Sequence, residues 1–131
     1  MITGECFCGA IKYRYGGELN NARSCHCSRC RKAFSGPSSA YAEVDNNKFQ
    51  WVCGREFLTH YSSNEEWGKS FCGKCGSTLC GTHNGEVHGV ALGCLNGQPD
   101  VVLRHHLFVG SKANWEELPQ GKVKQYEEYS K

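Results

Sequence analysis

The sequence has little that would direct the protein to a membrane or to nucleic acid. No apolar run approaches the about 18 consecutive residues that a membrane-spanning helix needs. The opening stretch MITGECFCGAIKYRY lacks the basic head and apolar run of a secretory signal peptide. Lys and Arg total 15 against 13 Asp and Glu, and the net charge of +2 argues against a large nucleic-acid footprint. We therefore expect a cytoplasmic protein with no membrane partner and no nucleic-acid partner.

The sequence also lacks long linkers, low-complexity segments and repeats, and its 131 residues suit one domain with one core. Short strand-like runs alternate with turns rich in Gly, Asn and Pro, at residues 11–15, 40–44, 48–52, 57–62 and 86–92. This pattern predicts a small, mainly β domain with one or two short helices, at about 28–34 and 112–118. We assign residues 1–118 to the domain and residues 119–131 to a loose polar C-terminal tail.

Cysteine is abundant, with ten residues. Disulfides rarely persist in the cytoplasm, so these cysteines are better explained as metal ligands or reactive thiols. Seven fall in three compact groups: CFCG (Cys6, Cys8), CHCSRC (Cys25, Cys27, Cys30) and CGKCG (Cys72, Cys75). Zinc takes four ligands, so one C-x-C and one C-x-x-C complete a site and leave the CHCSRC group one ligand short. Other pairings of the groups give the same totals, so spacing alone does not fix the partition.

Two interpretations of the incomplete group follow from ligand chemistry, and that chemistry supports them about equally. Structural zinc sites are closed, whereas catalytic sites keep an open position. The seven cysteines therefore suit one site of each kind. Alternatively, both zinc ions are structural, and Cys53, Cys80, Cys94 or a histidine completes the second site. For these three isolated cysteines a buried structural role is the default.

Four segments together resemble the signatures of the glutathione-dependent formaldehyde-activating enzyme (GFA) family, also called the centromere protein V-like family. They are GECFCGAIKYRY, SCHCSRCRKAFSG, YSSNEEWGKSFCGKCGSTL and HHLFVGSKANW, between residues 4 and 115. The resemblance implies a zinc-binding β fold similar to a Rab-binding zinc chaperone. It also implies two zinc ions per chain: a structural one on Cys6, Cys8, Cys72 and Cys75, and a catalytic one on Cys25, Cys27 and Cys30.

The same resemblance implies an activity. Characterised family members join glutathione and formaldehyde to give S-hydroxymethylglutathione, a reaction classed in reverse as that of a carbon–sulfur lyase. The implied partners are a glutathione-like thiol and a small aldehyde. The ligand chemistry agrees, because three thiolates outweigh the charge of Zn²⁺ and make water activation less favourable, whereas a soft thiol still binds as thiolate. Lys69-Ser70 before FC and Cys94 in GCLNGQPD depart from the usual family pattern and leave the exact substrate open.

Several polar residues near the incomplete group are candidate helpers. His26, between two ligands, is a catalytic candidate that could relay a proton, although packing or capping is the commoner role for such a residue. Arg29, Arg31 and Lys32 could bind substrate carboxylates, although such residues more often form a solvated face. Adjacent residues of a strand point to opposite sides, so at most one of His105 and His106 should line the site. We expect the CHCSRC turn and the strands that carry Cys94 and His106 to complete the pocket.

A non-enzymatic zinc-binding module for a protein partner is the main alternative. A third possibility, a nucleic-acid or microtubule-associated relative, would need a long basic extension that this sequence lacks. The incomplete group favours an enzyme, because a scaffold gains nothing from an unfilled coordination position. An exchangeable ligand on the second zinc would indicate the enzyme, and a fourth protein ligand would indicate the scaffold.

Overall fold

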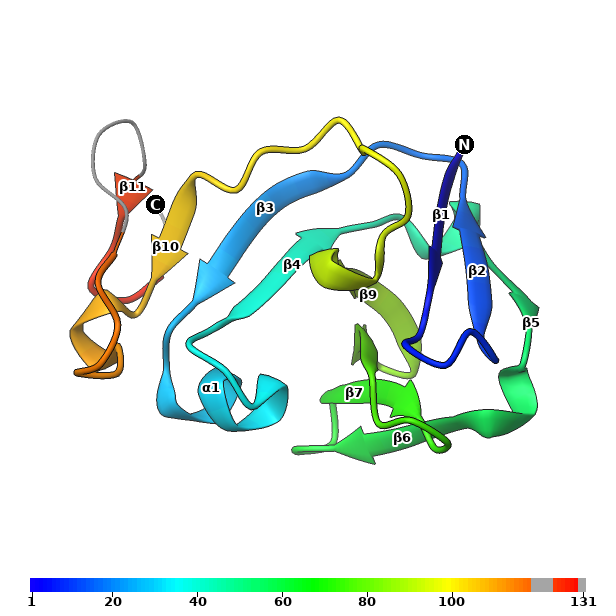
Figure 1. The fold of residues 1–131 in the computed structure, drawn as a ribbon, viewed down its shortest axis with the longest axis horizontal. Coiled ribbons are helices and arrows are strands. Elements are labelled where there is room, and N and C mark those ends of the chain that lie inside the picture. Colours follow the sequence, from blue (N-terminus) through cyan, green and yellow to red (C-terminus); the bar gives the residue numbers. More distant parts are fainter. Residues whose placement is uncertain (119–123, 130–131) are drawn as a thin grey trace.

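Two β-sheets and one short helix form the protein, described by a computed structural model over residues 1–118 and 124–129 (Figure 1). The small sheet has the order β1-β2-β5, with β1 (Ile2–Glu5), β2 (Lys12–Tyr15) and β5 (Phe49–Cys53). The large sheet has the order β11-β10-β3-β4-β9-β8-β7-β6. None of the helices within the described residues is long and apolar enough to cross a membrane.

The large sheet is mostly antiparallel, but β10 runs parallel to both β3 and β11. Its strands are β3 (Asn20–Cys25), β4 (Ser39–Glu43), β6 (Leu58–Ser62), β7 (Trp67–Cys72), β8 (Thr78–His83), β9 (Glu86–Ala91), β10 (His105–Leu107) and β11 (Lys124–Gln125). Helix α1 (Ser28–Phe34) connects β3 to β4. Four 3₁₀ turns complete the fold: η1 (Asn46–Lys48), η2 (Arg55–Phe57), η3 (Leu92–Cys94) and η4 (Val109–Ser111).

Alternating side chains of the small sheet form part of the core. In β2, Tyr13 and Tyr15 are buried, while Lys12 and Arg14 between them are exposed. The Tyr13 ring stacks on Phe49 with ring centroids 4.8 Å apart and meets Trp51 edge-on. Tyr13 belongs to one buried cluster with residues of β7, β8 and β9, so the two sheets share a core: Cys6, Ile11, Tyr13, Cys72, Leu79, Cys80, Val87 and Val90.

The mainly β prediction is confirmed. All five predicted strand runs fall on observed strands, namely β2, β4, β5, β6 and β9, and the predicted helix at 28–34 is α1. Alternation did not indicate β3, β7 or β10, because their sequences NNARSC, WGKSFC and HHL hold few apolar residues. Their pairing with neighbouring strands, and not an apolar face of their own, makes them strands.

The helix predicted at 112–118 is wrong. The chain instead makes η4 and then a turn, in which the Glu116 N–H donates to the Ala113 carbonyl at 3.2 Å. Lys112 Nζ donates to the Glu116 carbonyl at 3.0 Å, and the Glu116 carboxylate bonds to His26. A segment of about seven residues has little helix stability of its own, so these local bonds and the tertiary bond to His26 set its shape.

The polar tail predicted from residue 119 lies partly outside the described residues, namely at 119–123 and 130–131. Within the described part, β11 pairs with β10, and the Tyr126 N–H donates to the His106 carbonyl at 2.8 Å. The Tyr129 ring lies edge-on to Phe108, with ring centroids 4.9 Å apart. Residues 124–129 therefore lie against β10 and the start of η4.

Candidate metal centres

Two turns far apart in the sequence bring four thiols together. The CFCG turn links β1 to β2, and the CGKCG turn links β7 to β8. In each turn the glycine after the second cysteine has a positive φ, +78° at Gly9 and +83° at Gly76. Each of these glycines donates its N–H back to the carbonyl of the first cysteine of the turn. Glycine adopts this left-handed backbone without a steric cost, and the tight turns direct the cysteines toward one another.

The sulfur spacing in this group fits a tetrahedral ion. Four sulfurs at about 2.3 Å from zinc lie about 3.8 Å from one another. The Sγ atoms of Cys6 and Cys8 are 3.6 Å apart, and those of Cys8 and Cys72 are 3.9 Å apart. With Cys75, all four sulfurs lie within 4.8 Å of one another. Thiolate ligands suit zinc, so this group fits a closed, four-coordinate zinc site.

Hydrogen bonds prepare some of these thiols for ionisation. Burial raises the pKa of Cys6, but the Ile11 N–H, 3.3 Å from its sulfur, and the neighbouring thiols lower it overall. Burial likewise opposes ionisation of Cys75, but hydrogen bonding with Ser77 outweighs it and lowers the pKa to about 6. The Ala10 N–H favours the Cys8 thiolate, but desolvation and nearby thiols raise the pKa of Cys8 to about 11. The crowded sulfurs cannot all ionise without a compensating cation.

The second group lies where β3 enters α1. Cys25 ends β3, Cys27 caps the N-terminus of α1, and Cys30 lies in the first turn of the helix. The Cys30 N–H donates to Cys27 Sγ at 3.3 Å. All three sulfurs are half-buried and lie within 4.8 Å of one another. No fourth His, Cys, Asp or Glu among the described residues joins them.

One thiolate forms readily in this group. Hydrogen bonding with Cys25 outweighs burial and, with help from Ser39, Cys27 and the charge of Arg29, lowers the pKa of Cys30 to about 5. The same bond with Cys30, together with burial, raises the pKa of Cys25 strongly. A divalent cation would relieve this competition, because it stabilises several thiolates at once.

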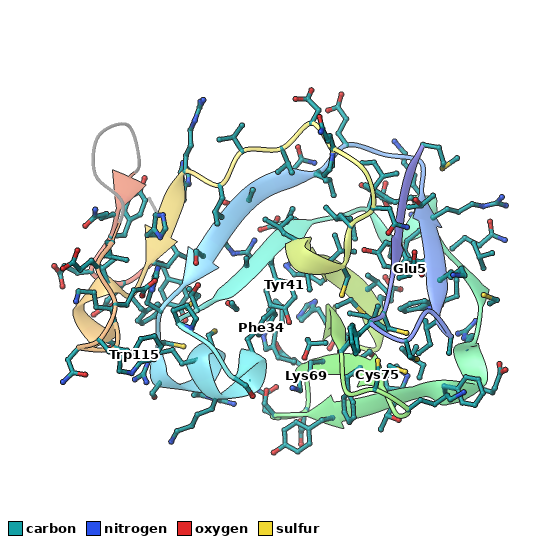
Figure 2. The ribbon with its side chains drawn as sticks, viewed as in Figure 1. Glu5, Phe34, Tyr41, Lys69, Cys75 and Trp115 are labelled. Atoms are coloured by element: carbon teal, nitrogen blue, oxygen red, sulfur yellow. The ribbon has the colours of Figure 1, made fainter. Side chains whose placement is uncertain are left out.

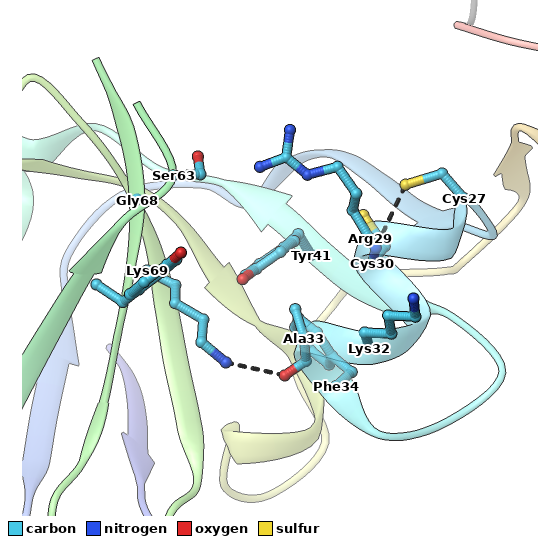
Figure 3. A pocket seen from close by; sticks show the side chains of 11 residues that line it. Cys27, Arg29, Cys30, Lys32, Ala33, Phe34, Tyr41, Ser63, Gly68 and Lys69 are labelled. Carbon is cyan, nitrogen blue, oxygen red and sulfur yellow. Dashed lines mark hydrogen bonds between the residues drawn. The ribbon is translucent and has the colours of Figure 1, made fainter. Parts of the chain in front are cut away.

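A cavity of about 590 Å³ opens beside Cys27 and Cys30 (Figure 3). Its other lining residues come from α1, β4 and the β6–β7 hairpin: Arg29, Lys32, Ala33, Phe34, Tyr41, Tyr61, Ser63, Gly68 and Lys69. These residues include three cations and no acid. Figure 2 shows Phe34, Tyr41 and Lys69 lying between α1 and β7. Lys69 Nζ donates to the Ala33 carbonyl at 3.0 Å, which ties the helix to β7.

The cavity differs from the sequence-based prediction in its walls. Strands carrying Cys94 and His106 were expected to complete it, but neither residue lines it. Tyr41, Tyr61 and Lys69 do, and sequence reasoning missed Tyr41 and Tyr61 entirely. Only the sheet order, which sets β6 and β7 opposite α1, brings them there. Of these three residues, Lys69 alone was singled out from the sequence, because it departs from the family pattern.

His26 does not line the cavity. Its side chain is 1% exposed, with Nδ1 2.9 Å from Glu116 Oε1 and Nε2 2.9 Å from His106 Nδ1. Burial, and after it the adjacent His26, lower the pKa of His106. His105 packs edge-on against Tyr126 instead.

The remaining predicted residues have varied positions. Arg29 and Lys32 line the cavity, whereas Arg31 does not. Cys80 is fully buried, Cys94 is half-buried with its Sγ 3.4 Å from the Thr78 carbonyl, and Cys53 is exposed, contrary to the buried default. None of these three cysteines joins either cluster in the described part of the chain.

The fold and these two thiol clusters define a small, mainly β protein with paired candidate metal centres. A model of the family described as glutathione-dependent formaldehyde-activating enzyme matches residues 1–111, and the chain belongs to this family. It is similar to the crystal structure of a Rhodobacter sphaeroides protein from structural genomics, with 32% identity and a TM-score of 0.57. That match covers 75% of this chain and 91% of the other. A search of curated proteins found no match.

Proposed function

We propose that the protein is a zinc-dependent carbon–sulfur lyase that acts on the adduct of a glutathione-like thiol with a small aldehyde such as formaldehyde. Family membership supports glutathione-dependent formaldehyde activation in general. One observation carries the finer proposal: three converging thiols without a fourth protein ligand lie beside a cavity lined by cations. In this proposal Cys6, Cys8, Cys72 and Cys75 hold a structural zinc, and Cys25, Cys27 and Cys30 hold a second one.

A zinc ion on the three-cysteine group would supply an open position that favours the thiolate form of a bound thiol. The cavity residues bind the rest of that molecule. Arg29, Lys32 and Lys69 attract carboxylates, and guanidinium groups bind them in a bidentate manner. Phe34 and Tyr41, whose rings meet edge-on at 5.1 Å, form an apolar wall for the chain between those carboxylates.

Tyr41 is placed to assist the bond-forming step. Tyr41 lines the cavity with its hydroxyl on the Lys69 side (Figure 3), and burial together with the nearby thiols of Cys80 and Cys30 raises its pKa, so it keeps its proton. When the thiolate sulfur adds to the aldehyde carbon, the C=O π pair moves to oxygen. The Tyr41 O–H can donate to that oxygen as charge develops. The alkoxide then takes a proton from water. In the reverse direction the adduct's hydroxyl loses its proton to water, the C–S bond breaks, the C=O bond re-forms and the thiolate leaves.

The test is a titration of cobalt-substituted protein with glutathione. We expect the visible absorption bands of the three-cysteine site to change, because the thiol enters the coordination sphere, and we expect Cys27→Ser to abolish the change. Apparent affinity should rise with pH until the thiol's own pKa is passed, since protons compete with the metal. Folded, metal-loaded protein that shows no spectral change with glutathione or any other small thiol would overturn the proposal in favour of a scaffold.

A matched pair of variants tests the role of the cavity. Arg29→Gln removes one positive charge at the cavity, and Arg55→Gln removes one from η2, outside it. Only Arg29→Gln should weaken binding of glutathione, by about tenfold for one lost charge-assisted contact. Binding of 2-mercaptoethanol, which has no carboxylate, should change in neither variant. Equal effects of the two substitutions would show that the cavity does not bind the carboxylates of glutathione.

A further inference from the structure

The two C-x-C segments differ in what holds their middle residue. In the four-cysteine group this residue is Phe7, whose side chain is 92% exposed. Only its backbone N–H is bonded, to Ser77 Oγ at 2.8 Å. In the three-cysteine group the middle residue is His26, which is 1% exposed and bonded through both ring nitrogens. The group that lacks a fourth ligand is therefore the one whose middle residue is held by hydrogen bonds.

Three hydrogen bonds anchor His26 to the C-terminal part of the domain. Its backbone N–H donates to the Leu107 carbonyl at 2.9 Å, which extends the pairing of β3 with β10. Its ring nitrogens contact His106 Nδ1 and Glu116 Oε1, each at 2.9 Å. His106 is itself 5% exposed. The segment between the two cysteines is thus held from two elements about 80 to 90 residues later in the chain.

The hydrogen bond to Glu116 has a definite direction. An ionised carboxylate only accepts, so Nδ1 of His26 carries the hydrogen that faces Glu116. Nε2 of His26 and Nδ1 of His106 share one hydrogen, and the tautomers of the two rings decide which nitrogen donates it. The chain of bonds links His106, His26 and Glu116. A substitution that removes the hydrogen-bonding group at His106 or the acceptor at Glu116 leaves a buried His26 nitrogen without a partner.

We propose that Glu116 and His106 are positioning residues, which hold His26 so that Cys25 and Cys27 face Cys30. Neighbouring side chains of an extended backbone point to opposite sides. Fixing His26 on one side therefore fixes both cysteines on the other. The four-cysteine group needs no such anchor, because a fourth ligand closes it. The inference rests on the proposed function only in assuming that the three-cysteine group binds zinc.

Zinc retention measures this role directly. Reduced, zinc-loaded protein is titrated with a chelator, and we expect two release steps, of which the weaker is absent in Cys27→Ser and so belongs to the three-cysteine group. Glu116→Ala should weaken that step by about 10- to 100-fold, the usual effect of removing a partner that orients a metal ligand. It should leave the tighter step unchanged. The exposed neighbour provides a matched control, since Glu117→Ala should change neither step.

Two substitutions of His106 separate hydrogen bonding from packing. His106→Asn keeps an amide that can donate or accept a hydrogen bond near the position of Nδ1, whereas His106→Leu keeps the volume and loses the hydrogen-bonding group. We expect Asn to retain most of the zinc affinity and Leu to lose about 10- to 100-fold. The opposite order would show a packing role and overturn the inference. The two His106 variants also test the inference if Glu116→Ala does not fold.

The wild-type result separates failure of the inference from failure of the proposed function. Fewer than two zinc ions in reduced wild-type protein would remove the basis of both. Two zinc ions, with a weaker step that Glu116→Ala and His106→Leu leave unchanged, would overturn the positioning role alone. Equal loss of zinc from both groups would likewise overturn it, because the effect would then be a general loss of structure.

Discussion

Single cysteines in this chain differ mainly in their surroundings. Cys30 lies among hydrogen-bonding thiols near Arg29, and its pKa falls to about 5. Cys80 lies fully buried in the shared core, and burial raises its pKa to about 12 despite hydrogen bonds with Ser70. The first thiol is prepared to be a ligand or to react, while the second behaves as a small apolar side chain.

Cys80 should make stability fall at alkaline pH. Its pKa is raised from 9.0 in the unfolded chain to about 12 in the folded protein. The stability that its neutral thiol contributes is therefore fully present below pH 9 and is lost as pH rises towards 12. The free energy of unfolding should decrease by up to about 1.4 kcal/mol per pH unit from this residue. Urea unfolding of reduced, zinc-loaded Cys80→Ala between pH 8 and 10 should show a shallower decrease than wild type.

The exposed Cys53 provides the control for this measurement. Cys53→Ala should follow the pH dependence of wild type, because that side chain is not buried. Identical slopes for wild type and Cys80→Ala would contradict the prediction.

Helices and strands in this protein gain their stability from contacts with one another. Helix α1 has seven residues and buries none of them fully, so it is too short to persist alone. Its N-terminus is capped by Cys27, and the Ala33 carbonyl near its C-terminus accepts from Lys69 on β7. The helix is thus held by a residue of the three-cysteine group at one end and by the cavity wall at the other.

Glycines at two turns allow a direct test of close packing between elements. Gly54, before η2, and Gly85, between β8 and β9, have φ of +79° and +80°. A Cβ at Gly85 would meet nothing within 4 Å, whereas one at Gly54 would overlap the Ala10 carbonyl oxygen. Gly85→Ala should cost about 1–2 kcal/mol for the left-handed backbone alone. Gly54→Ala should cost clearly more, as measured by urea unfolding, and equal costs would contradict this account.

Alternation in the sequence predicted elements well where one face of a strand is apolar. The buried tyrosines of β2 and the matching runs of β4, β5, β6 and β9 are of this kind. It could not predict β3 or β10, which are polar strands stabilised by their neighbours. The seven cysteines were found from spacing, and their division into two groups came from the family resemblance. The cavity walls Tyr41 and Tyr61 were not predicted, because sheet order determines which strands face α1.

The molecule as a whole is joined across its two sheets by the four-cysteine group. Cys8 follows β1 in the small sheet, and Cys72 ends β7 in the large sheet, 64 residues later. Zinc in small structural sites contributes on the order of 10 kcal/mol of folding free energy. That amount is comparable to the total stability of a typical domain.

Removing one ligand from each group should therefore have unequal consequences. Cys72→Ser should leave the protein largely unfolded at 25 °C, because the connection between the sheets is lost. Cys27→Ser should remain folded and lose one zinc ion. Circular dichroism with metal analysis of the same reduced samples checks both. Similar unfolding by the two substitutions would contradict the division into a structural and an open site.

The long separation between Cys8 and Cys72 also orders events during synthesis on the ribosome. Cys6, Cys8, Cys25, Cys27 and Cys30 all emerge before the other members of the two groups. At about 5–20 residues per second, Cys75 follows Cys30 by about 2–9 seconds. A zinc ion that bound during this interval would meet five nascent thiols and no CGKCG turn. The final distribution of metal between the two groups is therefore reached only after residue 75 has emerged, and the hydrogen-bonded support of His26 arrives later still, with Glu116.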